Sequence, residues 1–126
     1  MIAGGKPVFV DIDPDTLLID PNKIEEAITA KTKAIMPVHL YGRVCEMEKI
    51  NTIAKKHNLV VIEDTAQAFG ATCHCGKYAG MMSDCGTFSF YKTKNISTFE
   101  GGMICVPKGS NLDAEKIRAI CNQGQV

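Results

Sequence analysis

The sequence has no excess of charge of either sign and no run of like charges. Its 14 lysine and arginine residues balance its 14 aspartate and glutamate residues. A protein that binds nucleic acid or an anionic membrane through a basic face carries a positive excess on that face. Neither kind of partner is therefore expected.

Long apolar runs are also missing. No apolar stretch approaches the roughly 20 residues that a membrane-spanning helix needs. Met1 is followed by neither a basic region nor an apolar region of the kind that begins a secretory signal. We therefore expect no membrane partner and a cytoplasmic location.

Cysteine, in contrast, is abundant, with six residues in 126. Cys73, His74 and Cys75, with Cys85 beyond them, resemble half of a zinc site, but the second pair of ligands that structural zinc sites use is absent. We expect no metal site and, for a cytoplasmic chain, no disulfide framework. The remaining cysteines stand singly in apolar or helical contexts, as buried small side chains often do, and are Cys45, Cys105 and Cys121.

Short apolar runs alternate with amphipathic stretches along the chain. This alternation predicts an α/β fold, with a mostly parallel sheet and flanking helices in a single domain piece. The predicted strands are 6–11, 33–40, 59–62, 87–91 and 103–106. The predicted helices are 21–28, with Asp20 as its N-cap, 46–57, ended by Asn58, and 113–121; residues 70–80 are predicted to form a loop or small hairpin.

Three chemically active side chains follow predicted strands. His39, Asp64 and Lys94 stand at or just after strand ends. In open α/β sheets, ligands bind beyond the carboxyl ends of the strands, so these residues are candidates for one site. A lysine that is partly desolvated there loses its proton more easily and can form a Schiff base with an aldehyde cofactor. A nearby carboxylate can hold the ring nitrogen of pyridoxal phosphate protonated.

Four segments, in this order, resemble the DegT/DnrJ/EryC1/StrS family of pyridoxal-phosphate sugar aminotransferases. They are 4–13 (GGKPVFVDID), 37–42 (PVHLYG), 63–71 (EDTAQAFGA) and 88–102, which holds FSFYKTKN and EGG; the close of the chain, 116–125, is also similar. The resemblance implies part of a fold type I large domain that binds pyridoxal 5′-phosphate. It further implies transfer of an amino group to a nucleotide-linked keto-sugar, with glutamate as the expected donor. The resemblance also implies a homodimer.

The resemblance assigns Lys94 as the Schiff-base lysine, which also moves a proton. Lys92 is its alternative, because side chains two residues apart on an extended segment point the same way; the family register Phe-Ser-Phe-x-x-x-Lys-Asn selects Lys94. Asp64 would hold the ring nitrogen, although strand-end aspartates often serve only as caps. Glu63 competes with Asp64 but should point to the opposite face.

Four further assignments come from the resemblance or from position. Gln67 would lie over the cofactor ring or near its phenolic oxygen, unless it is a surface glutamine. Ser89 would donate a hydrogen bond to the cofactor phosphate, unless it is a structural strand serine. His39 is a possible pocket residue, although a histidine at a strand end is more often simply hydrogen-bonded there. Tyr91 is a possible pocket residue at a place where many family members carry histidine.

Family members are far longer than 126 residues. Residues 1–126 would then be a partial large domain whose N-terminal segment, which grips the phosphate, and C-terminal domain are absent. Residues 1–5 resemble the end of a helix. An alternative of another class is a non-catalytic fragment with exposed sheet edges. A dehydratase relative is a further alternative, but such members carry histidine in place of the lysine, and Lys94 argues against it.

Overall fold

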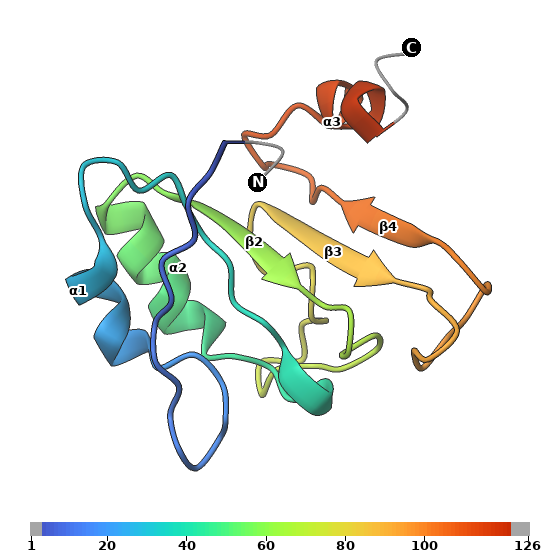
Figure 1. Cartoon of the computed structure of the whole chain (residues 1–126), viewed down its shortest axis with the longest axis horizontal. Coiled ribbons are helices and arrows are strands. Elements are labelled where there is room, and N and C mark those ends of the chain that lie inside the picture. The colour runs from blue at the N-terminus through green and yellow to red at the C-terminus, as the bar shows by residue number, and fades with distance from the viewer. Residues whose placement is uncertain (1–3, 122–126) are drawn as a thin grey trace.

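A four-stranded sheet organises the chain in a computed structural model that describes residues 4–121. The strands are β1 (Ala34–Ile35), β2 (Val60–Asp64), β3 (Cys85–Ser89) and β4 (Gly102–Cys105), and they lie in that order across the sheet. β1, β2 and β3 are parallel, and β4 pairs with β3 in the antiparallel direction. The mostly parallel sheet that the sequence predicts is confirmed (Figure 1).

The helices follow their predicted positions closely. They are α1 (Ile24–Ala27), which follows a 3-10 turn at Pro21–Lys23, α2 (Met47–Lys56) and α3 (Ala114–Cys121). The Asp20 carboxylate accepts a hydrogen bond from the Asn22 N–H, so the predicted cap is confirmed. Asn58 adopts a φ of 53° beyond the end of α2, a conformation that asparagine tolerates and that stops a helix. No helix among residues 4–121 is both long and apolar enough to span a membrane.

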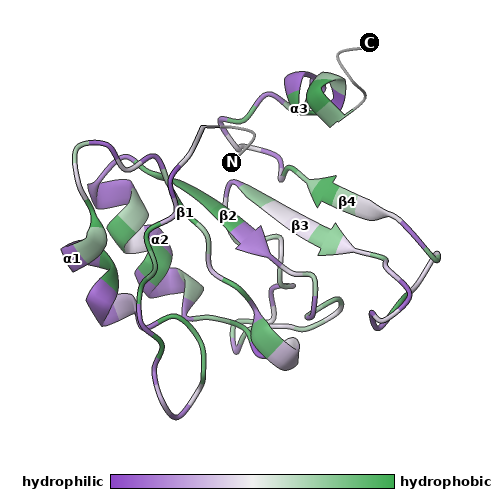
Figure 2. Cartoon of the chain, viewed as in Figure 1, coloured by the Kyte–Doolittle hydropathy of each residue, from purple (hydrophilic) through white to green (hydrophobic). Residues whose placement is uncertain are grey.

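The main core lies between one face of the sheet and α2. Ile35 and Val61 point from β1 and β2 toward the buried side of α2, where Ile50 has no exposed surface. The opposite face leaves Met36 and Val38 58% and 41% exposed. Along β2 the residues change from hydrophobic at the start to hydrophilic at the carboxyl end (Figure 2). The apolar part of the strand therefore anchors it, and its polar end is left for chemistry.

The predicted strand 6–11 is wrong. Residues 6–11 are irregular, and the nearest pairing is a single bridge between Ile12 and Ile19. Val8 and Phe9 remain 65% and 91% exposed. A strand needs a neighbouring edge for its N–H and C=O groups, and residues 6–11 pair with none of the described strands. The predicted strand 33–40 is likewise reduced to Ala34–Ile35, although pairing with β2 resumes at a bridge between Val38 and Asp64.

The cysteines depart from expectation in two places. Cys73 and Cys75 are joined by a disulfide, a single bridge that the sequence does not predict. The bridge closes the tip of a hairpin that pairs Thr72 with Tyr78, which brings the two thiols together without forming a wider framework. Cys45 is buried as predicted, and burial raises the pKa of its thiol to about 12, whereas Cys121 is exposed. Within residues 4–121 no cluster of three or more His, Cys, Asp or Glu side chains is placed to hold a metal ion.

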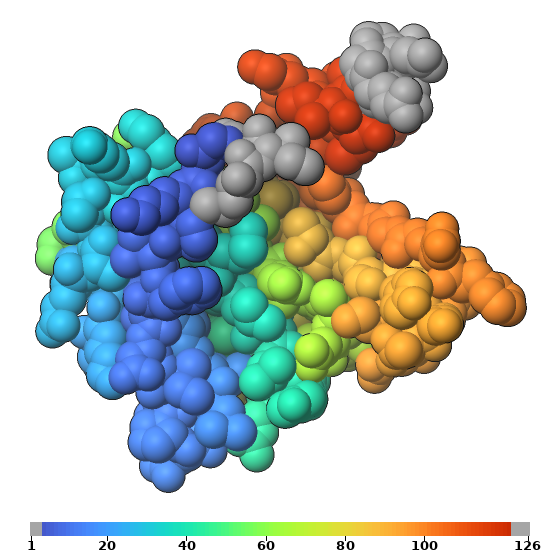
Figure 3. Space-filling view, in the orientation of Figure 1, coloured from blue at the N-terminus to red at the C-terminus, as the bar shows by residue number. Residues whose placement is uncertain are grey.

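α3 stands away from the sheet (Figure 3). It has no buried residues, and Ile120 is 71% exposed. The predicted start of this helix at Asp113 is correct to within one residue, and Asp113 caps it, because its Oδ1 accepts a hydrogen bond from the Lys116 N–H at 3.0 Å. The predictions that concern residues 1–3 and 122–126, namely the helix end and the last part of the family-like stretch, lie outside the described residues.

Candidate active site at the carboxyl ends of the strands

The candidate residues gather at one edge of the sheet. Asp64 is the last residue of β2 and Ser89 the last residue of β3, and these two strands are parallel (Figure 1). Asp64 is in register with Thr87, and Ser89 lies two residues further along the same strand. Because side chains two residues apart on a strand share a face, Asp64, Thr87 and Ser89 lie on one side of the sheet.

The backbone of Asp64 makes two hydrogen bonds, and its side chain makes one. Its N–H donates to the Pro37 carbonyl at 2.9 Å, and its carbonyl accepts from the His39 N–H at 3.0 Å. Its Oδ1 accepts from the Ala66 N–H at 3.0 Å, which is the local capping role that the sequence suggests. Oδ2 has no hydrogen-bond partner among the described residues, and the side chain is half-buried. The carboxylate is therefore fixed at one oxygen and available at the other.

Gln67 lies in a tight turn after β2, closed by the hydrogen bond from the Ala68 N–H to the Thr65 carbonyl. Its Oε1 accepts a hydrogen bond from the Tyr41 N–H at 3.3 Å. Tyr41 belongs to the 3-10 turn Leu40–Gly42 and adopts a φ of 53°. Gln67 is thus oriented by a segment that follows His39, and its two amide hydrogens are left to donate elsewhere.

The lysine segment follows β3 as a turn. The Lys94 N–H donates to the Tyr91 carbonyl at 2.9 Å, and the Ser89 hydroxyl accepts weakly from the Tyr91 N–H at 3.4 Å. Lys94 is half-buried, whereas Lys92 is exposed with its Nζ 5.7 Å from the centre of the Tyr91 ring. The Lys94 amine has no ion-pair or hydrogen-bond partner within residues 4–121. Of the two lysines, Lys94 is the more shielded from solvent.

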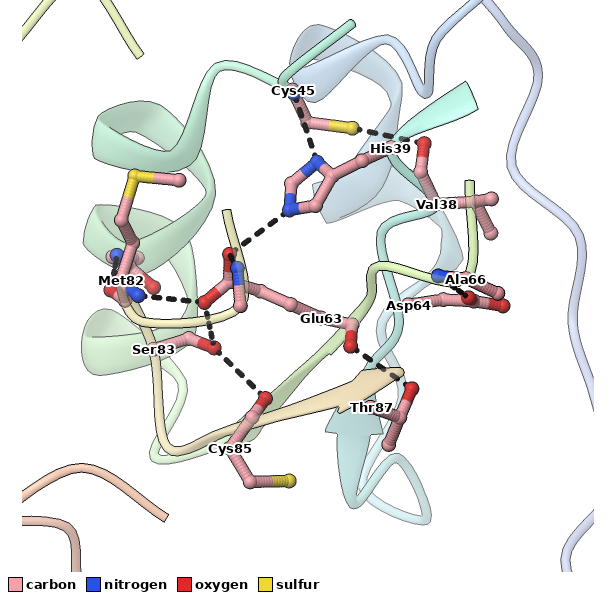
Figure 4. Close-up of polar contacts among 12 residues, drawn as sticks. Val38, His39, Cys45, Glu63, Asp64, Ala66, Met82, Ser83, Cys85 and Thr87 are labelled. Carbon is pink, nitrogen blue, oxygen red and sulfur yellow. Dashed lines mark hydrogen bonds and ion pairs between the residues drawn. The ribbon is translucent and has the colours of Figure 1, made fainter. Parts of the chain in front are cut away.

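Behind this edge, Glu63 occupies the centre of a buried hydrogen-bond cluster (Figure 4). One carboxylate oxygen accepts from His39 Nε2 at 2.9 Å and from the Gly80 N–H at 2.7 Å. The other accepts from the Met82 N–H at 2.7 Å and the Ser83 hydroxyl at 2.8 Å. Glu63 therefore points away from Asp64, as the alternation of side chains along a strand predicts.

His39 lies in the interior, with no exposed surface. Its Nε2 faces Glu63 and its Nδ1 accepts a hydrogen bond from the Cys45 N–H at 3.1 Å. Both ring nitrogens are occupied, so the ring offers nothing to a ligand in this arrangement. The geometry matches the alternative of a hydrogen-bonded strand-end histidine rather than a pocket residue, because the buried Glu63 carboxylate needs donors. Tyr91, the other possible pocket residue, is 44% exposed.

The segment that supplies Gly80, Met82 and Ser83 to Glu63 is not predicted from the sequence. Gly80 adopts a φ of 82°, and a Cβ there would lie 2.4 Å from the Phe88 ring and 2.9 Å from Thr65 Oγ1. Only glycine fits this close approach. One signal does point to it: a glutamate in an otherwise apolar buried strand has to find partners, since unpaired glutamate is almost never fully buried.

Acid titration should reveal the Glu63 cluster. Burial by itself would raise the pKa of Glu63, but the hydrogen bonds from His39, Gly80, Met82 and Ser83 outweigh it and hold the pKa below the ordinary 4.5. The carboxylate thus stabilises the fold fully above pH 4.5, and this contribution is lost as the pH falls through the lowered pKa. Urea unfolding at a series of pH values should show a steeper loss of unfolding free energy below pH 4.5 in the wild type than in Glu63→Gln. Equal slopes would show that Glu63 is not the ionised group.

Comparison with known proteins gives one consistent result. The model of the DegT/DnrJ/EryC1/StrS aminotransferase family matches residues 1–126. GDP-perosamine synthase of Caulobacter vibrioides is 52% identical over 124 residues, which are 97% of this chain and 32% of that protein.

Solved structures agree with the sequence comparison. The crystal structure of DesI in the presence of its TDP-sugar product superposes with a TM-score of 0.89 at 41% identity, covering 98% of this chain and 31% of DesI. NtdA of Bacillus subtilis, with bound cofactor PMP, has a TM-score of 0.74 at 46% identity, covering 84% of this chain and 23% of NtdA. The chain therefore spans about a third or less of the length of the proteins that it matches.

Proposed function

Because the chain belongs to the DegT/DnrJ/EryC1/StrS aminotransferase family, we propose that it forms part of the cofactor-binding large domain of a pyridoxal-phosphate-dependent sugar aminotransferase. The observation that carries this proposal is the arrangement at the carboxyl ends of β2 and β3. A half-buried carboxylate with one free oxygen stands there beside a strand-end hydroxyl, and a half-buried lysine follows in the next turn.

The residues present fit the chemistry of pyridoxal phosphate. The cofactor has a basic ring nitrogen, a phenolic oxygen, a phosphate and an aldehyde. Asp64 offers an anionic acceptor, Gln67 two amide hydrogens, Ser89 a hydroxyl and Lys94 a primary amine. When bound, the cofactor supplies an aldehyde that bonds to amines and a protonated ring that takes up electron density.

Each residue then has a role that follows from its own chemistry. Oδ2 of Asp64 would accept a hydrogen bond from the protonated ring nitrogen, while the Ala66 N–H keeps Oδ1 in place. Gln67, fixed through Oε1 by Tyr41, donates toward the phenolic oxygen. The Ser89 hydroxyl would donate to the phosphate. The Lys94 amine would hold the cofactor covalently and, once the amino donor has displaced it, would move the proton at the reacting carbon.

Amino transfer to a nucleotide-linked keto-sugar, with glutamate as donor, is the proposed reaction. A GDP-perosamine synthase and a protein solved with a TDP-sugar product support the substrate class. A lysine at position 94 favours amino transfer over the dehydration catalysed by relatives with histidine there. A cytoplasmic homodimer is proposed for the parent enzyme.

Transfer of a labelled amino group tests this function. The chain is incubated with pyridoxal 5′-phosphate, ¹⁵N-glutamate and a GDP- or TDP-linked keto-sugar. The mass of the sugar nucleotide is then measured by mass spectrometry. We expect ¹⁵N in the sugar only when the cofactor is present. Cofactor binding without transfer supports the second hypothesis, a non-catalytic piece of such an enzyme. Failure to bind the cofactor at all contradicts the proposal for this chain.

A further inference from the structure

His39 and Glu63 form a buried pair, and each lies in a segment that contacts Asp64 or Gln67. We propose that His39 and Glu63 are positioning residues, which fix the direction of the Asp64 carboxylate and of the Gln67 amide toward a bound cofactor. This inference rests on the proposed function, because it concerns residues assigned to the cofactor there.

The charge state of the pair follows from its hydrogen bonds. The Cys45 N–H donates to His39 Nδ1, so that nitrogen carries no proton and the single ring hydrogen lies on Nε2. Nε2 then donates to Glu63, whose two oxygens meet four donors in all. Three N–H groups donate to the carboxylate, and the Ser83 hydroxyl, which also lies 3.3 Å from the Cys85 carbonyl, is the fourth neighbour. Hydrogen bonds donated to a carboxylate favour its anionic form. The pair is a neutral imidazole bound to an anion.

Two short paths lead from this pair to the cofactor-facing residues. Glu63 precedes Asp64 on β2, so its fixed side chain holds the strand from the face opposite the Asp64 side chain. On the other path, the His39 N–H donates to the Asp64 carbonyl, and two residues later the Tyr41 N–H donates to Gln67 Oε1. A shift of the backbone at His39, which the buried ring anchors through Glu63 and the Cys45 N–H, would therefore reach both the Asp64 carbonyl and the partner of Gln67.

The far side of the cluster is anchored in the core. Ser83 and Met82 bind Glu63, and the Met82 carbonyl accepts from the Asn51 side chain of α2 at 2.8 Å. Asp84, next along the chain, accepts from the Val61 N–H at 2.8 Å. The Glu63 carboxylate thus links the segment that holds Met82 and Ser83 to His39 and to the end of β2 that carries Asp64 (Figure 4).

Packing alone does not require these two residues. A buried ionised side chain and its partner can often be replaced together by apolar residues of similar size with no loss of stability. A polar cluster with all its partners satisfied, in contrast, fixes one arrangement of the groups that it joins. Orientation is therefore the property that His39 and Glu63 add to this part of the fold.

The test measures how well the protein distinguishes pyridoxal 5′-phosphate from its analogue with carbon in place of the ring nitrogen. Asp64 interacts with that nitrogen, so the wild type should bind the true cofactor about tenfold or more tightly, as expected for a charged hydrogen bond. His39→Gln keeps a donor near Glu63 but loses the acceptor for Cys45, and should lower this ratio at least about threefold. Ser83→Ala removes one of the four donors and should lower it less. His57→Gln is the matched control, since His57 pairs with Glu25 at the surface, and should leave the ratio unchanged.

Amide exchange provides a readout without cofactor. His39→Gln should speed exchange of the Ala66 N–H, which is bound to Asp64, several-fold, while the His57 N–H at the end of α2 stays unchanged. Equal acceleration of exchange at both amides would show that the pair serves general stability, and would overturn the proposal. A fall in affinity for the cofactor and for its analogue by the same factor would also overturn it. A wild-type ratio of one would instead contradict the role of Asp64 in the proposed function.

Discussion

Replacing Lys94 by alanine is expected to abolish covalent capture of pyridoxal phosphate by this chain. Lys94 is the half-buried lysine of the turn after β3, and its amine has no competing partner in residues 4–121. Loss of the amine also removes the group that moves the proton, so any turnover should fall about 10²- to 10⁴-fold, the usual contribution of a general acid or base. Borohydride reduction after incubation with the cofactor, followed by peptide mapping, measures the capture.

Lys92→Ala is the matched control for that experiment. Lys92 lies two residues away, is exposed and stacks near the Tyr91 ring, so its removal should leave the labelled peptide unchanged. Label that disappears with Lys92 and persists without Lys94 would reverse the assignment of the two lysines. Label spread over several surface lysines would mean that residues 1–126 do not form the site.

Asp64→Asn should weaken binding of pyridoxal 5′-phosphate by about ten- to a hundredfold, the range expected when a hydrogen bond loses its charge. Asparagine keeps an oxygen for the Ala66 N–H, so the turn after β2 should survive. The substitution replaces the other carboxylate oxygen by an amide NH2 group and removes the negative charge that would face the ring nitrogen. Binding is followed by the change in cofactor absorbance on titration with protein.

Asp113→Asn controls for the general effect of changing a capping aspartate. Asp113 accepts from the Lys116 N–H at the start of α3, away from the sheet edge, and asparagine is as good a cap. Cofactor affinity should not change in this variant. If Asp64→Asn binds the cofactor as tightly as Asp113→Asn does, Asp64 serves only as a local cap.

The predicted elements were right where a local pattern decides the conformation. The prediction for α2 was correct to within one residue at each end, because the apolar side chains of Met47, Ile50 and Ala54 repeat at helical spacing and all face the core. β2 was predicted from its apolar run. The segment 6–11 contains a shorter apolar run, at 8–10, and forms no strand, because strand formation also depends on pairing with a neighbour, which no local pattern reveals.

Part of the candidate site could also be predicted from local sequence patterns. His39, Asp64 and Lys94 could be placed at or just after strand ends from the sequence, and ligands of open α/β sheets bind beyond those ends. The opposite directions of Glu63 and Asp64 also follow from strand alternation alone. The sequence thus determined the family, the sheet and the residues that are candidates to face a cofactor.

Only the tertiary structure decided what lies behind them. The four donors to Glu63 come from residue 39 and residues 80–83, which are distant along the chain and meet only when β1, β2 and β3 pair. The same pairing buries His39 and turns it from a possible pocket residue into a partner of Glu63. A hydrogen bond between distant residues depends on the path of the whole backbone, and a local strand-end motif does not predict that path.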